Sequence, residues 1–294
     1  MIAIENTYAE AFDGLYTRVI VTGEPERLRI AAQNSTALPS IVINRTEGGI
    51  EKWLSEEETP DRRPGAILQF WGRLNEKKIE ESVENFYKEI SYRIRQGILV
   101  VPTTSIFNAT ESNNTIDTMQ RIGHCGDGYE WEEKYFDRNV IKIPLMMGDF
   151  IIERHLGYGR GVMGGNIWFM CTDENSALEA GKKAVAAIGE IRGAITTFDI
   201  CSAGSKPETK FKEIGPTTNH IFCPTLRNKI KDSTVPEGIN SIPEIVFNGI
   251  SLEVLKCATK AAIESVKDVK GVKKISAGNY GGKLGKYKIY LRQL

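Results

Sequence analysis

The fold is decided by the segment EIVFNGISLEVLKCATKAAIESVKDVKGVKKISA, residues 244–277. It opens with a mainly apolar run from Glu244 to Asn248, which is typical of a buried strand. Ser251 is a favourable N-cap residue, and the apolar side chains after it recur at helical spacing to about Lys267. The mainly apolar stretch 272–277 predicts a second strand. The segment therefore predicts a strand–helix–strand unit.

Three more units of this kind come earlier in the chain. The first unit has predicted strands at 16–22 and 40–44, with a helix that begins after Gly23. The second has strands at 66–71 and 98–102 around a helix at 76–96. The third has strands at 166–172 and 194–198 around a helix at 176–191. Two consecutive units form the split βαβ, or ferredoxin-like, arrangement, an antiparallel sheet with two helices on one face. We therefore predict an α+β chain of two pseudo-duplicated ferredoxin-like lobes, residues 1–146 and 147–294.

Long polar connections interrupt both predicted lobes. They cover residues 110–137 and 201–242, and the glycine-rich segment 157–161 predicts a further irregular loop between the lobes. Connections of this length are uncommon in compact domains and often carry function. We therefore expect a binding site that is built from these loops.

Composition limits the classes of partner. Lys and Arg number 38, as do Asp and Glu, so the net charge of zero disfavours nucleic acid, including RNA on a ferredoxin-like sheet. No apolar run approaches the roughly 18 residues of a membrane span, and the N-terminus lacks the pattern of a signal peptide. Five scattered cysteines are typical of a reducing compartment, and three separated histidines do not suggest a metal site. The expectation is a cytoplasmic protein without nucleic-acid or membrane partners.

The closing segment, residues 276–285, is the most unusual stretch of the chain. Four glycines fall within the eight residues 278–285. Glycine is favoured where the backbone takes a positive φ or approaches another group closely. Asn279 and Lys283 lie within this loop and are candidate substrate contacts. The alternative is a tight turn and a bulge before the last strand.

Two loop segments carry further candidates for substrate binding. Asp127 stands between two glycines and could hold a substrate amine, while Tyr129 could stack on a ring. Thr217, Thr218 and Asn219 supply hydroxyl and amide groups that orient small polar ligands. In each segment the alternative is a turn in which these side chains cap the local backbone.

Glu244 is the candidate for proton transfer. It follows Pro243 at the start of an apolar strand, where burial would raise the pKa of its carboxyl and make it a usable general acid. The alternative is an edge-strand glutamate that pairs with a Lys or Arg side chain.

With these residues in view, the chain resembles the formylmethanofuran:tetrahydromethanopterin formyltransferase family. The similar segments appear in the family's order and extend over essentially the whole chain. They are residues 5–12, 59–65, 125–129, 143–150, 164–166, 217–225, 244–249 and 276–285. The first and last of these segments are the most specific.

The resemblance implies a fold and an assembly as well as an activity. The fold would be two ferredoxin-like lobes, and the assembly a homotetramer, or at least a dimer, with the active site at a subunit interface. The enzyme would move a formyl group between N-formylmethanofuran and N5 of tetrahydromethanopterin, in archaeal-type one-carbon metabolism (methanogenesis or its reverse). Methanofuran and tetrahydromethanopterin would be coenzyme substrates, with no tightly bound cofactor and no metal.

The resemblance also assigns a role to Glu244, because that residue lies in the E-I-V-x-N-G context of the family's proposed catalytic glutamate. In such a reaction the pterin N5 attacks the formamide carbonyl, an oxyanion forms, and the departing amine gains a proton. Protonated Glu244 would donate to the oxyanion or to the leaving nitrogen. The alternative function is that of a divergent, non-catalytic paralogue that acts as a binding or regulatory protein.

Overall fold

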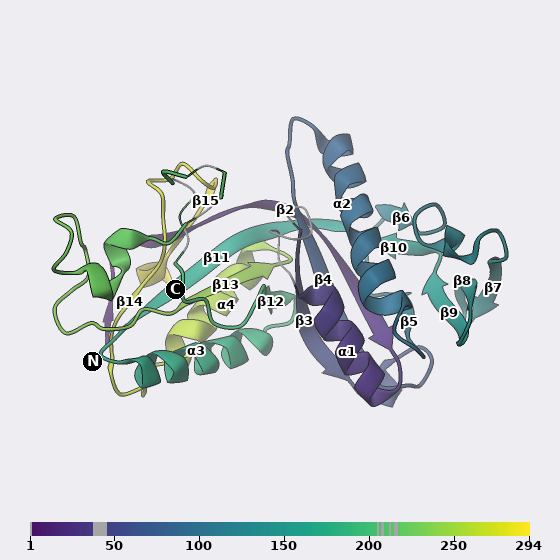
Figure 1. Ribbon diagram of the computed structural model, residues 1–294, viewed down its shortest axis with the longest axis horizontal. Helices are drawn as coiled ribbons and strands as arrows, with labels where there is room; N and C mark the ends of the chain where they lie inside the picture. Colours follow the sequence, from purple (N-terminus) through teal and green to yellow (C-terminus); the bar gives the residue numbers. More distant parts are fainter. Residues whose placement is uncertain (1, 38–45, 205, 207–208, 212, 215–216) are drawn as a thin grey trace. The chain divides into compact units, whose positions relative to one another are not determined.

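The computed structural model describes residues 2–37, 46–204, 206, 209–211, 213–214 and 217–294. The chain is a mixed α/β protein, with four α-helices in these ranges (Figure 1). It divides into two compact units, Met1–Phe12 with Val162–Leu294, and Asp13–Gly161. The bounds of these units differ from those of the predicted lobes 1–146 and 147–294, and the lobe division stays a prediction.

The unit that contains residues 162–294 is built on a sheet in the order β14–β11–β13–β12, in which neighbours are antiparallel. Helices α3 and α4 pack against each other and against β12 and β13 (Figure 1). The short strand β1 lies parallel to β14, and β15 pairs with the first residues of β2. The bounds are β1 Ala3–Ile4, β2 Tyr8–Thr22, β11 Gly159–Cys171, α3 Glu174–Gly189, β12 Ala194–Thr196, β13 Glu244–Gly249, α4 Leu252–Ser265, β14 Val272–Ser276 and β15 Tyr287–Tyr290.

Both helices of this unit begin at a side-chain cap. The Asp173 carboxylate accepts the backbone N–H of Ser176 at 2.8 Å, and the Ser251 hydroxyl accepts that of Val254 at 3.2 Å. These bonds satisfy N–H groups that the first helical turn leaves without partners. The facing sides of the helices are rich in buried alanine, which allows the helices to approach each other and the sheet closely.

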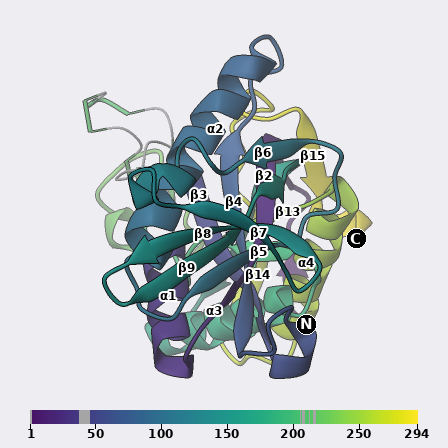
Figure 2. The ribbon, with the colours of Figure 1, turned by 90° about the vertical axis from the view of Figure 1, so that its right-hand side faces the viewer.

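The unit of residues 13–161 contains a sheet in the order β3–β4–β2–β5, again antiparallel. Helices α1 and α2 pack on β3 and β4, and β9, β8 and β7 extend the sheet beyond β5 (Figure 2). A separate ribbon pairs β6 with β10. The bounds are α1 Pro25–Thr36, β3 Thr46–Leu54, β4 Gly65–Arg73, α2 Ile79–Ile94, β5 Ser105–Asn108, β6 Thr115–Asp117, β7 Trp131–Tyr135, β8 Arg138–Leu145, β9 Gly148–Glu153 and β10 His155–Gly157.

Short helical turns complete the chain. They are the 3₁₀ turns η1 Glu56–Glu58, η3 Gly123–Gly126, η4 His220–Phe222, η5 Pro224–Leu226 and η6 Leu291–Gln293, and the π-helical turn η2 Arg95–Leu99.

The helices and most strands of the four predicted units are confirmed, and two expectations are wrong. The strand expected at 98–102 is absent because the chain continues from α2 into η2, and β5 begins only at Ser105. A Cβ on Gly97 would lie 2.7 Å from Ser35 Cα, so this turn packs directly on α1. The segment 157–161, expected to be irregular, lies in β10 and β11 apart from Tyr158, which connects them. The strand expected at 40–44 lies outside the described residues.

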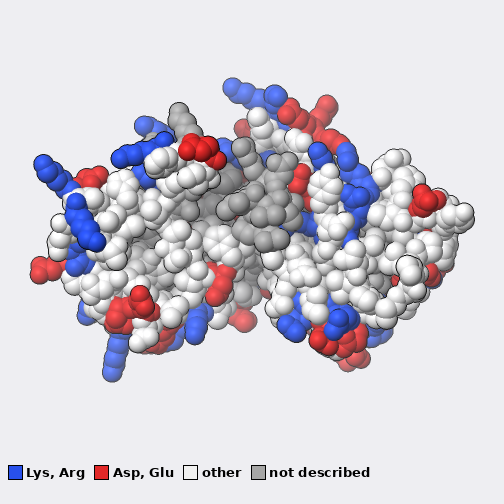
Figure 3. Space-filling model, viewed as in Figure 1, with Lys and Arg blue, Asp and Glu red and all other residues white. Residues whose placement is uncertain are grey.

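Surface charge gives no single-sign field on the face shown in Figure 3, where Lys and Arg are interspersed with Asp and Glu. This agrees with the equal numbers of basic and acidic residues in the sequence. Of the helices in the described ranges, none combines the length and apolar character needed to cross a bilayer.

Candidate active site

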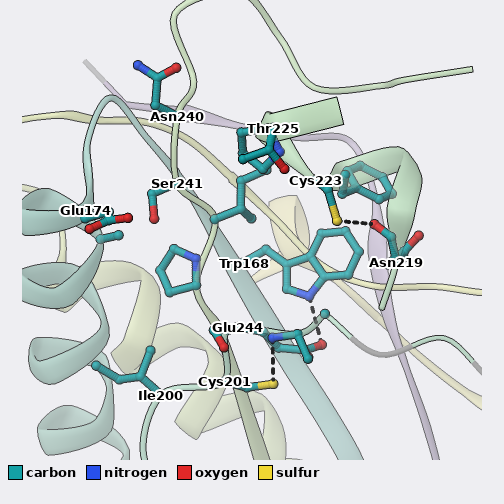
Figure 4. Close-up of a pocket in the computed structure, with 18 of the residues that line it drawn as sticks. Trp168, Glu174, Ile200, Cys201, Asn219, Cys223, Thr225, Asn240, Ser241 and Glu244 are labelled. Carbon is teal, nitrogen blue, oxygen red and sulfur yellow. Dashed lines mark hydrogen bonds between the residues drawn. The ribbon is translucent and has the colours of Figure 1, made fainter. Parts of the chain in front are cut away.

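A cavity of about 400 Å³ lies in the unit that contains residues 162–294 (Figure 4). Trp168 of β11 and Glu244 of β13 form part of its wall, and the first turns of α3 contribute Glu174 and Leu178. Most of the remaining lining belongs to residues 200–204, 219–225 and 240–243. The long connection 201–242, expected from the sequence to build a site, therefore supplies much of the cavity wall.

Glu244 is held between two neighbouring segments. Its backbone lies opposite Trp168 in the β11–β13 ladder, and it exchanges both backbone hydrogen bonds with Cys201, at 2.8 and 2.9 Å. The side chain is 6% exposed, and Trp168 Nε1 donates to Glu244 Oε1 at 2.9 Å (Figure 4). The position is therefore not at a sheet edge, and among the described residues no Lys or Arg side chain forms the ion pair with Glu244 that the alternative interpretation required.

The environment raises the pKa of the carboxyl at this position. Burial raises the pKa of Glu244, and hydrogen bonds from Trp168 and Cys201 offset this only in part. Burial also raises the pKa of the Cys201 thiol, which keeps it in the protonated form. The pKa of Tyr280 is raised to about 12 by burial and by the charges of Glu244 and Glu10. For Glu244, burial outweighs the effect of its hydrogen-bond donors, and the resulting raised pKa is suited to a general acid.

The closing glycine-rich segment folds around a carboxylate that the sequence analysis did not identify. Glu10 Oε1 accepts the backbone N–H of Tyr280 and Gly282 at 2.5 and 2.6 Å, and Oε2 accepts those of Leu284 and Gly285 at 2.8 and 3.2 Å. The backbone of Gly282 has a φ of 77°, which a larger residue would rarely adopt. Sequence reasoning had no signal for Glu10, because its partners follow about 270 residues later.

The predicted binding residues of this unit lie in two places. Asn219 lines the cavity and is 9% exposed. The Thr218 hydroxyl donates to the Ala203 carbonyl at 2.9 Å, and Thr217 forms a backbone bridge with Lys206. Both contacts join residues 217–218 to residues 203–206 of the same long connection.

Asn279 and Lys283 lie on the exposed side of the glycine-rich segment. The Asn279 amide donates to Thr7 Oγ1 at 2.8 Å. Neither residue is among those that line the cavity.

Asp127 and Tyr129 belong to the other compact unit, after η3. Asp127 has a left-handed φ of 55° and its N–H donates to the His124 carbonyl at 3.1 Å, which is the turn geometry of the alternative interpretation. Tyr129 is 79% exposed. Neither residue is among those that line the cavity.

Two residues of the site itself were missed from the sequence as functional groups. Trp168 lies in a predicted strand, but only the structure shows that its indole points to Glu244. Cys201 was counted only as one of several scattered thiols, and its pairing with Glu244 depends on the path of the long loop.

Comparison with known families identifies the family of the chain. The family model described as formylmethanofuran-tetrahydromethanopterin formyltransferase matches residues 1–145, and the model for the proximal lobe of the same family matches residues 148–294. The chain belongs to this formyltransferase family.

Members of the formyltransferase family match the chain along its whole length. A relative from Archaeoglobus fulgidus, named a formylmethanofuran–tetrahydromethanopterin formyltransferase-like protein, is 55% identical over 100% of the chain and 96% of its own length. The solved formyltransferase of Methanosarcina barkeri has a TM-score of 0.89 at 38% identity, over 99% of this chain and 98% of that one. A chain in the formyltransferase/hydrolase complex of Methylorubrum extorquens, solved with methylofuran, also has a TM-score of 0.89, at 32% identity over 99% of this chain and 96% of that one.

Proposed function

We propose that the chain transfers a formyl group between N-formylmethanofuran and N5 of tetrahydromethanopterin, with Glu244 as the general acid. The observation that carries this proposal is a buried carboxyl of raised pKa on the wall of a cavity. Membership of the formyltransferase family supports the reaction, and the methylofuran complex of a relative supports the furan-type coenzyme. The reaction is a step of archaeal-type one-carbon metabolism, in methanogenesis or its reverse.

The steps of the reaction balance without a further reactant. The N5 lone pair attacks the formyl carbon, a C–N bond forms, and negative charge develops on the carbonyl oxygen. Glu244 donates its proton to this oxygen or directly to the departing methanofuran nitrogen. A proton taken up by the oxygen passes on to that nitrogen as the carbonyl re-forms, so in either case the C–N bond to methanofuran breaks and methanofuran leaves as the neutral amine. The proton released from N5 then restores Glu244. Such proton transfer contributes roughly 10²–10⁴-fold to a rate.

The Trp168 hydrogen bond occupies one oxygen of the Glu244 carboxyl, which also receives a hydrogen bond from Cys201. Because the indole donates to Oε1 at 2.9 Å, we assign the transferable proton to Oε2. Correct positioning of the two coenzymes would supply much of the remaining acceleration, since proximity alone is worth roughly 7–11 kcal/mol. The cavity of about 400 Å³ is within the ordinary range for small-molecule sites.

Seven residues remain proposed substrate contacts. Asn219 has the most direct support, because it lines the cavity. Asn279 and Lys283 are exposed on the segment that surrounds Glu10. The other four are Asp127, Tyr129, Thr217 and Thr218.

We infer a ferredoxin-like fold for each lobe, with a pseudo-duplication and a boundary near residue 146. The strand orders β14–β11–β13–β12 and β5–β2–β4–β3 support the inference. When the four strands of each sheet are numbered along the chain, both sheets have the order fourth, first, third, second. The two family models, which end at 145 and begin at 148, support the boundary.

We also propose a homo-oligomer, a tetramer or a dimer, with the site at a subunit interface, in the cytoplasm. Free thiols at all five cysteines are consistent with a reducing compartment. Light scattering after size-exclusion chromatography measures the oligomeric state directly, and a monomer would contradict that part of the proposal.

The reaction is tested by mixing the purified chain with formylmethanofuran and tetrahydromethanopterin and separating the pterins by chromatography with mass detection. The proposal predicts formyl-tetrahydromethanopterin only when both coenzymes and the chain are present. Reactions that lack one coenzyme are the controls. A folded chain that gives no product in either direction would contradict the proposal and favour the binding or regulatory paralogue.

A further inference from the structure

Glu10 is a buried carboxylate whose hydrogen bonds serve one loop. It lies on β2, it is 1% exposed, and its two oxygens accept four backbone N–H groups of residues 280–285. A buried charge is costly unless hydrogen bonds satisfy it. Because four donors converge on one carboxylate, the charge and the conformation of the loop depend on each other.

The loop held by Glu10 continues into a contact with Trp168. Gly278 exchanges two hydrogen bonds with the Asn166 side chain: its N–H donates to Oδ1 at 2.6 Å, and its carbonyl accepts from Nδ2 at 3.2 Å. A Cβ on Gly278 would lie 2.7 Å from Trp168 Cζ2, so the backbone here lies directly against the indole. The loop therefore forms one side of the space that Trp168 occupies.

Trp168 contacts both this loop and Glu244, the proposed proton donor. Its indole N–H donates to Glu244 Oε1, and its ring also meets Phe222 edge-on, with ring centroids 4.7 Å apart. A shift of the loop would free the ring on the side of Gly278. The carboxyl of Glu244 would then lose a fixed partner.

We propose that Glu10 is a positioning residue for formyl transfer: its carboxylate fixes residues 280–285, this keeps the adjoining Gly278 backbone against Trp168, and the indole in turn orients Glu244. The effect on rate rests on the proposed function. The effect on the Trp168 side chain does not, because it follows from contacts within the unliganded chain.

The test compares Glu10→Gln with the wild-type chain, both labelled with ¹⁵N at the tryptophan indoles. The chain has four tryptophans, and Trp168→Phe identifies the signal of Trp168. Glu24→Gln is the matched control, because the Glu24 carboxylate also accepts two backbone N–H groups, at the start of α1. We expect Glu10→Gln to shift the Trp168 signal and to speed exchange of its indole proton with solvent, and Glu24→Gln to do neither.

The kinetic measurement separates positioning from folding. A misplacement of about 1 Å can cost roughly 10²-fold, so we expect Glu10→Gln to lower kcat by about 10- to 100-fold with a smaller change in KM. Glu10→Asp keeps the charge and should recover part of the loss. A Glu10→Gln variant of lower melting temperature, but with an unchanged Trp168 signal and unchanged kcat, would show that Glu10 is only structural.

A second variant keeps the proposal testable if Glu10→Gln does not fold. Gly278→Ala leaves Glu10 intact and places a methyl group against the indole, so it should shift the Trp168 signal and lower kcat. An unchanged signal and rate in Gly278→Ala would overturn the coupling between loop and indole. If the wild-type chain transfers no formyl group, the proposed function fails, while the Trp168 signal still decides the positioning role.

Discussion

Trp168→Phe should shift the pH dependence of formyl transfer toward alkaline pH. The indole N–H donates to the Glu244 carboxyl at 2.9 Å, and the residue Glu244 is only 6% exposed. This bond stabilises the ionised carboxyl more than the protonated one, and it lowers the pKa of Glu244 against the larger raising effect of burial. Phenylalanine keeps most of the ring and removes the donor.

The size of the shift follows from the strength of the lost bond. A hydrogen bond to a charged group is worth about 1.5–3 kcal/mol and one between neutral groups about 0.5–1.5 kcal/mol. The difference, about 1–1.5 kcal/mol, corresponds to about one pKa unit at 1.36 kcal/mol per unit. Since Glu244 acts in its protonated form, the alkaline limb of kcat should move up by about one pH unit.

The assay is the pH–rate profile of formyl transfer for the wild-type chain and Trp168→Phe at saturating coenzymes. The plateau rate should also fall, because the carboxyl is less well oriented. The same substitution combined with Glu244→Gln is the control, and it should show no such limb. An alkaline limb that stays in place, or moves to lower pH, would refute the role of Trp168 as a donor to the ionised carboxyl.

Other predictions follow from the remaining contacts. Burial raises the pKa of the Glu10 carboxyl, but its four backbone donors lower it more, so the net pKa is below the ordinary 4.5. Chemical denaturation should therefore show Glu10→Gln less stable than wild type at pH 7, with the difference vanishing as pH falls through the lowered pKa; a difference that persists there would contradict this. Gly285→Ala should lower the melting temperature, at a cost of about 1–3 kcal/mol, because its Cβ would lie 2.2 Å from a backbone oxygen of β2. Gly189→Ala, at the end of α3, should instead be neutral or stabilising, because a Cβ there would meet no atom of another segment within 4 Å. An equal fall in melting temperature for Gly285→Ala and Gly189→Ala would refute the steric argument. Burial raises the pKa of the Cys171 thiol to about 12, whereas Cys257 is exposed. Thiol reagents at pH 8 should therefore label Cys257 well before Cys171, and peptide mass mapping measures the order of labelling.

The helices and central strands could be predicted from the sequence because their patterns are local. Apolar spacing and capping residues such as Ser251 locate α3, α4 and the strands around them. The added strands β7, β8 and β9 were missed because they lie outside the strand–helix–strand units on which the prediction rested. β7 also has no buried residue, whereas β8 and β9 do carry buried apolar side chains. The turn η2 was missed because the helical pattern of α2 simply continues into it.

The candidate site was only partly predictable, because its key contacts join residues far apart in the chain. Glu244 was identified by its place at the start of an apolar strand, and the structure shows the burial that this position implies. The bond from Trp168 and the pairing with Cys201 depend on sheet register and on the path of a long loop. The role of the glycine-rich segment around Glu10 has no local sign in the sequence, because the acceptor lies at the other end of the chain.

The central claim is that Glu244 supplies the proton for formyl transfer, and Glu244→Gln tests it most directly. Glutamine keeps the size of the side chain and an acceptor for the Trp168 indole, but it cannot donate a carboxyl proton. Glu253→Gln on the exposed face of α4 is the matched control. We expect kcat for formyl transfer to fall by roughly 10²–10⁴-fold in Glu244→Gln and to stay at the wild-type value in the control. A folded Glu244→Gln variant with the full wild-type rate would contradict this claim.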